Sequence, residues 1–121
     1  MREAWERYRR PMVISEAHLG CEDPFEQVRW LMEVWNAVKT LRQEGADIRA
    51  VTAWALFGLV DWHVMLRERH ALYEPGAFDR RFDPPKLTLL GDTIGELARE
   101  GRFNHPALST PGWWRRQAVD A

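Results

Sequence analysis

The spacing of hydrophobic and polar residues along the chain predicts three helices and two strands. Apolar residues three and four positions apart indicate the helices, whereas short apolar and β-branched runs indicate buried strands. In chain order the predicted elements are a helix over residues 2–10, a strand over 12–15, a helix over 24–44, a strand over 48–56 and a helix over 86–100. A strand, a helix of about 20 residues and a second strand are typical of a parallel βαβ unit, and so of an α/β fold.

The helix over residues 24–44 has strong start and stop signals. Asp23 is the expected N-cap, Pro24 occupies the first helical position, and Glu26 is placed to complete a capping box. Gly45 provides the C-terminal stop. These signals make the position of this helix the firmest local prediction in the chain.

The last part of the chain differs from the rest in its pattern. Residues 1–101 carry the predicted helices and strands and form a partial α/β domain, whereas residues 102–121 contain prolines and little periodicity. We expect the second segment to be an irregular tail or linker. The Trp113–Trp114 pair within it predicts a packed anchor.

Composition narrows the function classes. The 121 residues carry 17 basic and 18 acidic side chains, and this balance argues against a nucleic-acid partner. The single cysteine, Cys21, excludes an internal disulfide and suits a reducing compartment. No apolar run approaches the roughly 20 residues of a membrane span, and no signal peptide is apparent. We therefore expect a cytoplasmic protein without a membrane partner. The four histidines lack metal-ligand spacing, so neither a metal nor a cofactor is predicted.

Candidate chemistry lies where the predicted strands end. In parallel α/β architectures, functional side chains gather at the carboxyl ends of the strands. Glu16 ends the first strand, and a carboxylate there must be paired, hydrogen-bonded or functional, because an isolated buried charge is costly. The alternative to a functional role for Glu16 is a structural ion pair with Arg10 or Arg49. His18 lies two residues after Glu16, so an extended chain directs both side chains to the same face.

Two segments carry a resemblance to a known family. Residues 6–16 (ERYRRPMVISE) resemble the seventh-strand region of glycoside hydrolase family 1, the β-glucosidase type, and residues 54–62 (WALFGLVDW) resemble its eighth-strand segment. Residues 74–79 occupy the place of a further family stretch. The resemblance covers roughly residues 5 to 100. It implies the C-terminal quarter of a TIM (β/α)8 barrel, with strands 7 and 8 and their helices.

The resemblance also implies a chemistry, namely retaining hydrolysis of an O-glycoside by two carboxylates. Glu16 matches the catalytic nucleophile, and Trp54 matches the indole under the sugar ring. Asp61 matches the acid that binds sugar hydroxyls, and Trp62 matches its companion tryptophan. His18 is a further candidate for lining the sugar pocket.

Departures from the family pattern accompany these matches. Ala17 and His18 follow the nucleophile position, where the family has Asn-Gly, and Ala55 stands in place of a serine. The family's general acid/base lies in an Asn-Glu-Pro motif, and no Asn-Glu pair occurs in this chain. We therefore expect the chain alone to be inactive. Residues 104–116 resemble the junction in bacterial fusions of such a module to a dTDP-4-dehydrorhamnose reductase-like module, which suggests nucleotide-sugar or polysaccharide metabolism.

Several functional interpretations stay open. The chain is either the nucleophile-bearing fragment of a retaining glycosidase, with a carbohydrate substrate and the remainder of the barrel as partner, or a catalytically inactive sugar-binding or interaction module derived from one. Self-association is a third possibility, because two strands per chain would let four copies close an eight-stranded barrel, and unpaired strand edges demand a partner. A further alternative is that the chain is an unstable fragment from a truncated reading frame, without a function of its own.

Overall fold

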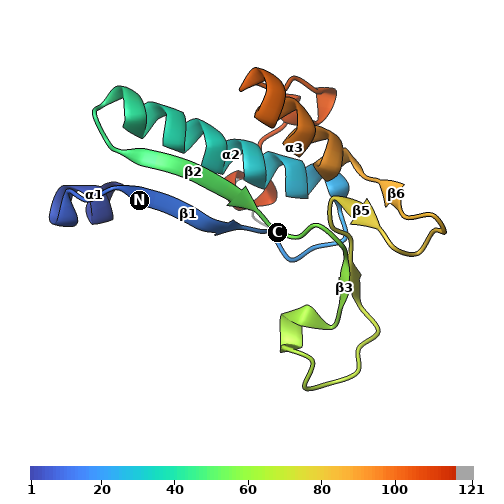
Figure 1. Ribbon diagram of the computed structural model, residues 1–121. Coiled ribbons are helices and arrows are strands. Elements are labelled where there is room, and N and C mark those ends of the chain that lie inside the picture. The colour runs from blue at the N-terminus through green and yellow to red at the C-terminus, as the bar shows by residue number, and fades with distance from the viewer. Residues whose placement is uncertain (117–121) are drawn as a thin grey trace.

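The computed structural model describes residues 1–116 and arranges its longer helices on one side of a small parallel sheet (Figure 1). The helices and strands, in chain order, are α1 (Arg2–Tyr8), β1 (Met12–Ala17), α2 (Pro24–Gln43), β2 (Ile48–Ala53), β3 (Leu59–Val60), η1 (Trp62–Val64), β4 (Tyr73–Glu74), β5 (Phe78–Asp79), β6 (Lys86–Leu87), α3 (Leu89–Glu100), η2 (Pro106–Ser109) and η3 (Trp113–Arg115), where η denotes a 3-10 helix. Residues 117–121 lie outside this description.

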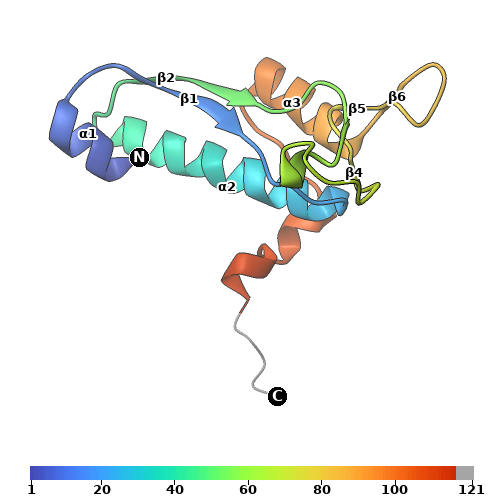
Figure 2. The same ribbon diagram turned by 90° about the horizontal axis from the view of Figure 1, so that it is seen from below.

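The βαβ prediction is confirmed in the first half of the chain. β1 and β2 pair in parallel, with Val13 opposite Ala50 and Ile14 opposite Val51. The connection between them is α2, which lies along one face of the two strands when the molecule is seen from two directions (Figures 1 and 2). Parallel pairing needs a crossover of this length, since a tight turn can join only antiparallel strands.

The predicted quarter of a (β/α)8 barrel is wrong. Residues 1–116 form three separate sheets of two strands each, and only β1 and β2 are parallel. After β2 the chain turns back on itself. β3 pairs with β4 and β5 pairs with β6, both in antiparallel fashion. The barrel prediction depended on the two resembling segments, whereas the strands that follow β2 pair with each other in two-residue antiparallel ladders instead of extending the parallel sheet.

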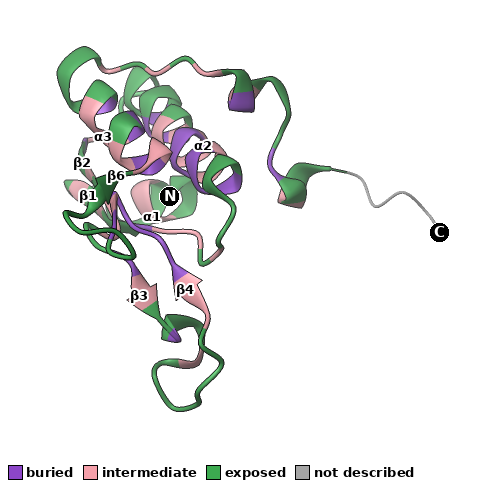
Figure 3. Cartoon of the chain, turned by 90° about the vertical axis from the view of Figure 1, so that its right-hand side faces the viewer, coloured by how far each residue is buried: buried purple, intermediate pink, exposed green. Residues whose placement is uncertain are grey.

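The helix α2 supplies the centre of the core. Its apolar stripe contributes Val28, Leu31 and Met32 to a cluster completed by Ala17, Leu90 and Leu97 from β1 and α3. A smaller cluster joins the C-terminal part of α2 to Ile48 of β2. The side view shows buried residues along α2 and, apart from the helices, in the segment that continues from β4 (Figure 3). No helix within residues 1–116 has the length and apolar character needed to cross a membrane.

The helix termini follow their local sequence in part. Asp23 caps α2 as predicted, and its carboxylate accepts hydrogen bonds from the backbone N–H groups of Phe25 and Glu26 at 2.8 and 3.3 Å. The capping-box prediction is wrong, because the Glu26 carboxylate binds Arg29 and the backbone N–H of Trp113 instead. α3 begins at Leu89, three residues later than predicted, since Lys86 and Leu87 pair with β5.

The described part of the tail packs on α2 rather than leaving the domain. Trp114 packs edge-on against Trp30 of α2, with ring centroids 5.1 Å apart, and its indole N–H donates to Glu33 Oε2 at 2.7 Å. The Arg115 guanidinium pairs with the other oxygen of Glu33. The predicted anchor is therefore confirmed for Trp114, whereas the Trp113 side chain is 58% exposed.

Candidate functional site

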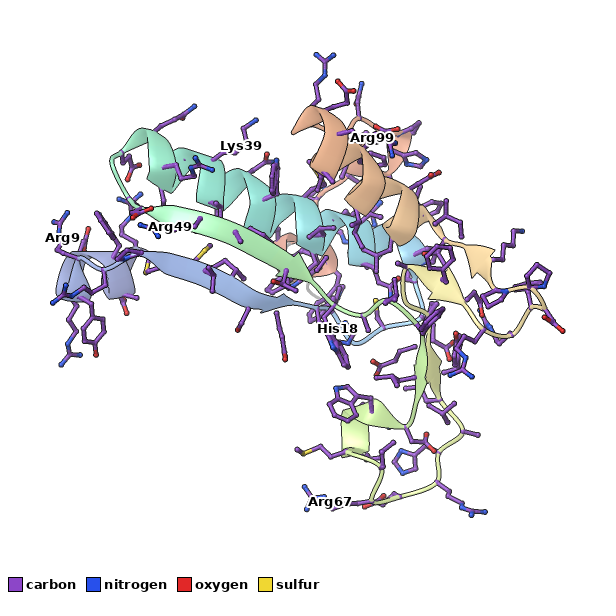
Figure 4. All side chains as sticks on the ribbon, viewed as in Figure 1. Arg9, His18, Lys39, Arg49, Arg67 and Arg99 are labelled. Atoms are coloured by element: carbon purple, nitrogen blue, oxygen red, sulfur yellow. The ribbon has the colours of Figure 1, made fainter. Side chains whose placement is uncertain are left out.

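Three predicted site residues meet just beyond the carboxyl ends of β1 and β2. His18 follows β1 and Trp54 follows β2, and their rings meet edge to face with centroids 4.7 Å apart. Trp62, at the start of η1, also contacts Trp54, with ring centroids 5.4 Å apart and ring planes tilted by 42°. Figure 4 shows His18 at this point, where the sheet ends and the β3–β4 hairpin begins. The peptide bond between Trp54 and Ala55 is cis.

His18 is held by hydrogen bonds at both ring nitrogens. Its Nδ1 lies 3.1 Å from the carbonyl oxygen of Trp54, and because a carbonyl can only accept, this nitrogen is the donor. Its Nε2 lies 3.1 Å from Oε2 of Glu74 in β4. The imidazole therefore links the ends of β2 and β4 and fixes its own orientation beside Trp54.

Glu74 is the site residue for which sequence reasoning assigned no role. It is 3% exposed, and within residues 1–116 its Oε1 is buried without a hydrogen-bond partner. Gly20 lies against this carboxylate, since a Cβ at that position would be 3.3 Å from Oε1. No motif around Glu74 indicates this contact, because its partner His18 is 56 residues away in the sequence.

Asp61 lies beside the aromatic cluster but its carboxylate is engaged by the backbone. It is 7% exposed and accepts hydrogen bonds from the N–H groups of Ala71 and Leu72 at 3.2 and 3.0 Å. Burial alone raises the pKa of Asp61, but the N–H groups of residues 70–72 and the nearby His63 outweigh it, so the pKa lies below its usual value. Asp61 thus ties the two sides of the hairpin together, and its predicted contact with sugar hydroxyls stays a prediction.

Glu16 lies on β1 with an exposed side chain. It lines an open groove with a volume of about 430 Å³ between β1 and α2, which it shares with His18, Trp30 and Glu33. Within residues 1–116, Glu16 makes no ion pair or hydrogen bond through its side chain. The expected alternative of a pair with Arg10 or Arg49 is therefore wrong, since Arg49 binds Asp47 at 3.0 Å.

The groove and the aromatic cluster share one residue, His18. The structure thus brings His18, Trp54 and Trp62 together at one corner. It places Glu16 next to that corner on the groove side, and directs the Asp61 carboxylate to the backbone of the hairpin. No contact joins the Glu16 carboxylate to either indole ring in the described part of the chain.

No group of three or more His, Cys, Asp or Glu side chains in the described chain could hold a metal ion. The nearest arrangement is the exposed pair of His63 Nε2 and His70 Nδ1, 2.8 Å apart, with Glu68 on the far nitrogen of His70. Two imidazoles this close make a hydrogen bond, with one ring donating and the other accepting.

Comparison with known proteins adds no assignment. No known family model matches the chain, and a search of curated proteins finds no match either. The resemblance of residues 6–16 and 54–62 to glycoside hydrolase family 1 therefore stays a prediction.

Proposed function

We propose that the chain binds carbohydrate, with the Trp54–Trp62 indole pair as the stacking surface. The observation that carries the proposal is the tilted contact of these rings at the carboxyl ends of parallel strands, with Trp62 40% exposed. Indole rings offer a flat apolar face to the C–H face of a pyranose and a polar N–H at their edge. A sugar-binding module is the one of our two leading predictions that needs no second carboxylate.

Polar groups around the rings support a hydrophilic ligand. The Glu16 carboxylate is exposed and free of protein partners within the described residues, so it can accept hydrogen bonds from sugar hydroxyls. His18 is fixed by Glu74 and the backbone, so the wall next to Trp54 is rigid before the ligand arrives. Preorganisation of this kind reduces the entropy lost on binding.

The affinity carried by Trp62 can be approximated from contact area. One pyranose face covers on the order of 80 Å² of indole, and at about 25 cal/mol per Å² this contributes about 2 kcal/mol. Loss of that contact weakens binding about 30-fold.

The test uses the full chain and a matched pair of tryptophan variants. Cellobiose, a β-linked glucose disaccharide, is titrated into the wild type and into Trp62→Ala and Trp113→Ala while heat and tryptophan fluorescence are recorded. Trp113 is an exposed tail indole, so its removal controls for the general loss of an aromatic side chain. We expect weaker binding only in Trp62→Ala. Absence of cellobiose binding by the wild type, or an equal loss in both variants, would contradict this function.

A second candidate function follows from the free carboxylate of Glu16. In retaining glycoside hydrolysis, such a group attacks the anomeric carbon while the leaving group departs with the bonding electrons. A 2,4-dinitrophenyl 2-fluoro-β-glucoside would then leave a fluoroglucosyl ester on Glu16 and release dinitrophenolate. Intact-mass spectrometry of wild type, Glu16→Gln and Glu22→Gln tests this, with Glu22 as a nearby exposed control. Labelling lost only in Glu16→Gln supports it, and an unlabelled wild type rejects it.

A further inference from the structure

The folded chain exposes more surface than its mass accounts for. Its accessible surface is 8705 Å², whereas a monomeric protein of 14.2 kDa exposes about 6,800 Å². The excess is about 1,900 Å². Five fully exposed residues correspond to about 800 Å², and this amount is set aside from the excess. The remaining excess, at least about 1,100 Å², must come from the described residues.

One source of this excess is the face of the β1–β2 sheet that α2 leaves open. Met12 and Ile14 of β1 face the core, so the intervening Val13 and Ser15 face the other way. Ala50 and Thr52 of β2 share that outer face, and all four residues are exposed, Val13 by 58%. None of them is charged. Parallel sheets are normally covered on both faces, and a lone two-stranded sheet is marginal.

The second source is the hairpin that we call the arm, residues 59–74. The arm leaves the body on the side of the sheet opposite α2 and α3, so the sheet and the arm form an L (Figures 1 and 3). Its tip carries Met65 and Leu66, which are 64% and 65% exposed. Val60 and Trp62 add further exposed apolar surface along its length. A projecting tip of this kind buries little of its own apolar surface.

We propose that two copies of this chain form a two-fold symmetric dimer in which the arm tip of each copy packs on the open sheet face of the other. Met65 and Leu66 give the tip an apolar part beside the charged Arg67, Glu68 and Arg69. Val13, Ser15, Ala50 and Thr52 give the sheet face an uncharged part, and the exposed Arg49 next to it is paired with Asp47. The apolar part of the tip and the uncharged part of the face suit each other. A two-fold dimer uses both contacts twice, which is the commonest symmetry of homo-oligomers. An excess of about 1,100–1,900 Å² per chain corresponds to roughly 2,000–4,000 Å² per dimer, within the range of obligate homodimers.

The first experiment measures the mass of the full chain in solution by light scattering during gel filtration. We expect twice 14.2 kDa for the wild type. Ser15→Lys on the sheet face and Met65→Glu on the arm tip should each weaken dimerisation on the order of 100-fold, because each buries a charge in the uncharged part of the proposed contact. Asn36→Lys, an exposed position on α2, is the matched control and should stay dimeric.

Mixing the variants distinguishes a disrupted contact from a disrupted fold. When Ser15→Lys and Met65→Glu chains are combined, one of the two contacts in the mixed dimer pairs opposite charges and the other is wild type, so dimerisation should return. Misfolded variants would not recover on mixing. A folded wild-type monomer, or a dimer that both single variants leave intact, overturns the proposal.

Discussion

Helix α3 packs closely against Ala77, in the segment that follows Glu74. Two glycines of α3, Gly91 and Gly95, allow a paired test of this packing. A Cβ at Gly91 would lie 2.4 Å from the backbone carbonyl oxygen of Ala77, closer than van der Waals contact permits. A Cβ at Gly95 would meet only the end of the flexible Arg99 side chain at 3.2 Å. The same substitution, glycine to alanine, therefore has opposite expected effects one turn apart.

The magnitudes follow from two opposing contributions. Alanine in a helix interior is favoured over glycine by about 1 kcal/mol, and Gly95→Ala should gain about that amount. Gly91→Ala gains the same but must displace backbone, and overpacking costs about 1–3 kcal/mol, at the upper end here because a carbonyl cannot rotate aside. We expect Gly91→Ala to lose about 1–2 kcal/mol of unfolding free energy. The two variants should then differ by about 2–3 kcal/mol.

Urea unfolding at a fixed protein concentration, followed by far-UV circular dichroism, measures this difference. With a slope of about 1.5 kcal/mol/M, the midpoints of the two variants should lie about 1.3–2 M apart, on either side of the wild type. A Gly91→Ala chain as stable as the wild type would refute the close approach of α3 to Ala77. Equal shifts of both variants would show that helix propensity alone decides the outcome.

Three further predictions concern the cap of α2, the tail and the arm. Asp23→Ala should lower the unfolding free energy by about 1 kcal/mol in the same urea assay, because two backbone N–H groups lose their acceptor, whereas Glu22→Ala should change it little. The hydrogen bond from Arg115 lowers the pKa of Glu33, burial opposes this effect, and the hydrogen bond from Trp114 adds to the lowering, so the pKa lies below its ordinary value of about 4.3. The contact of the tail with Glu33 should therefore be complete above about pH 4.3 and lost as the pH falls through the lower native pKa. The indole N–H resonance of Trp114 should report this change, and its absence in that range would contradict the contact. Asp61→Ala should speed amide hydrogen exchange at Ala71 and Leu72 while leaving Phe78 protected, and unchanged exchange at both would contradict the role given to Asp61.

The sequence pattern predicted the longer helices and strands, in which the spacing of apolar residues repeats, and missed the short strands. α2 and the parallel strands follow from a cap, an apolar stripe and β-branched runs. The strands of the arm and β5–β6 have two residues each, too few to show any period, so their antiparallel pairing could not be predicted. That pairing also delayed the start of α3 and is incompatible with the predicted barrel quarter.

The site was predictable to the extent that it depends on residue type at strand ends. His18 is a candidate because it lies two residues after Glu16 at the end of the first strand, and Trp54 is a candidate because it matches the family's eighth-strand segment. The structure brings these two rings into contact. Glu74 could not be chosen in this way, because its role depends on a contact across 56 residues and on the small size of Gly20. The exposure of the Glu16 side chain was likewise not predictable, since the apolar residues before it predict a buried strand.

The polar residues of the site hold the fold, and this decides which groups remain for a ligand. Glu74 uses one carboxylate oxygen in its hydrogen bond with His18. The Asp61 carboxylate accepts hydrogen bonds from the backbone N–H groups of Ala71 and Leu72 on the opposite side of the arm. Both carboxylates are less than 10% exposed, so neither presents its oxygens to a ligand at the surface. The groups still open are the indole faces and the Glu16 carboxylate. Binding at this corner should therefore depend mainly on stacking, and the loss of affinity in Trp62→Ala should exceed that in Glu16→Gln.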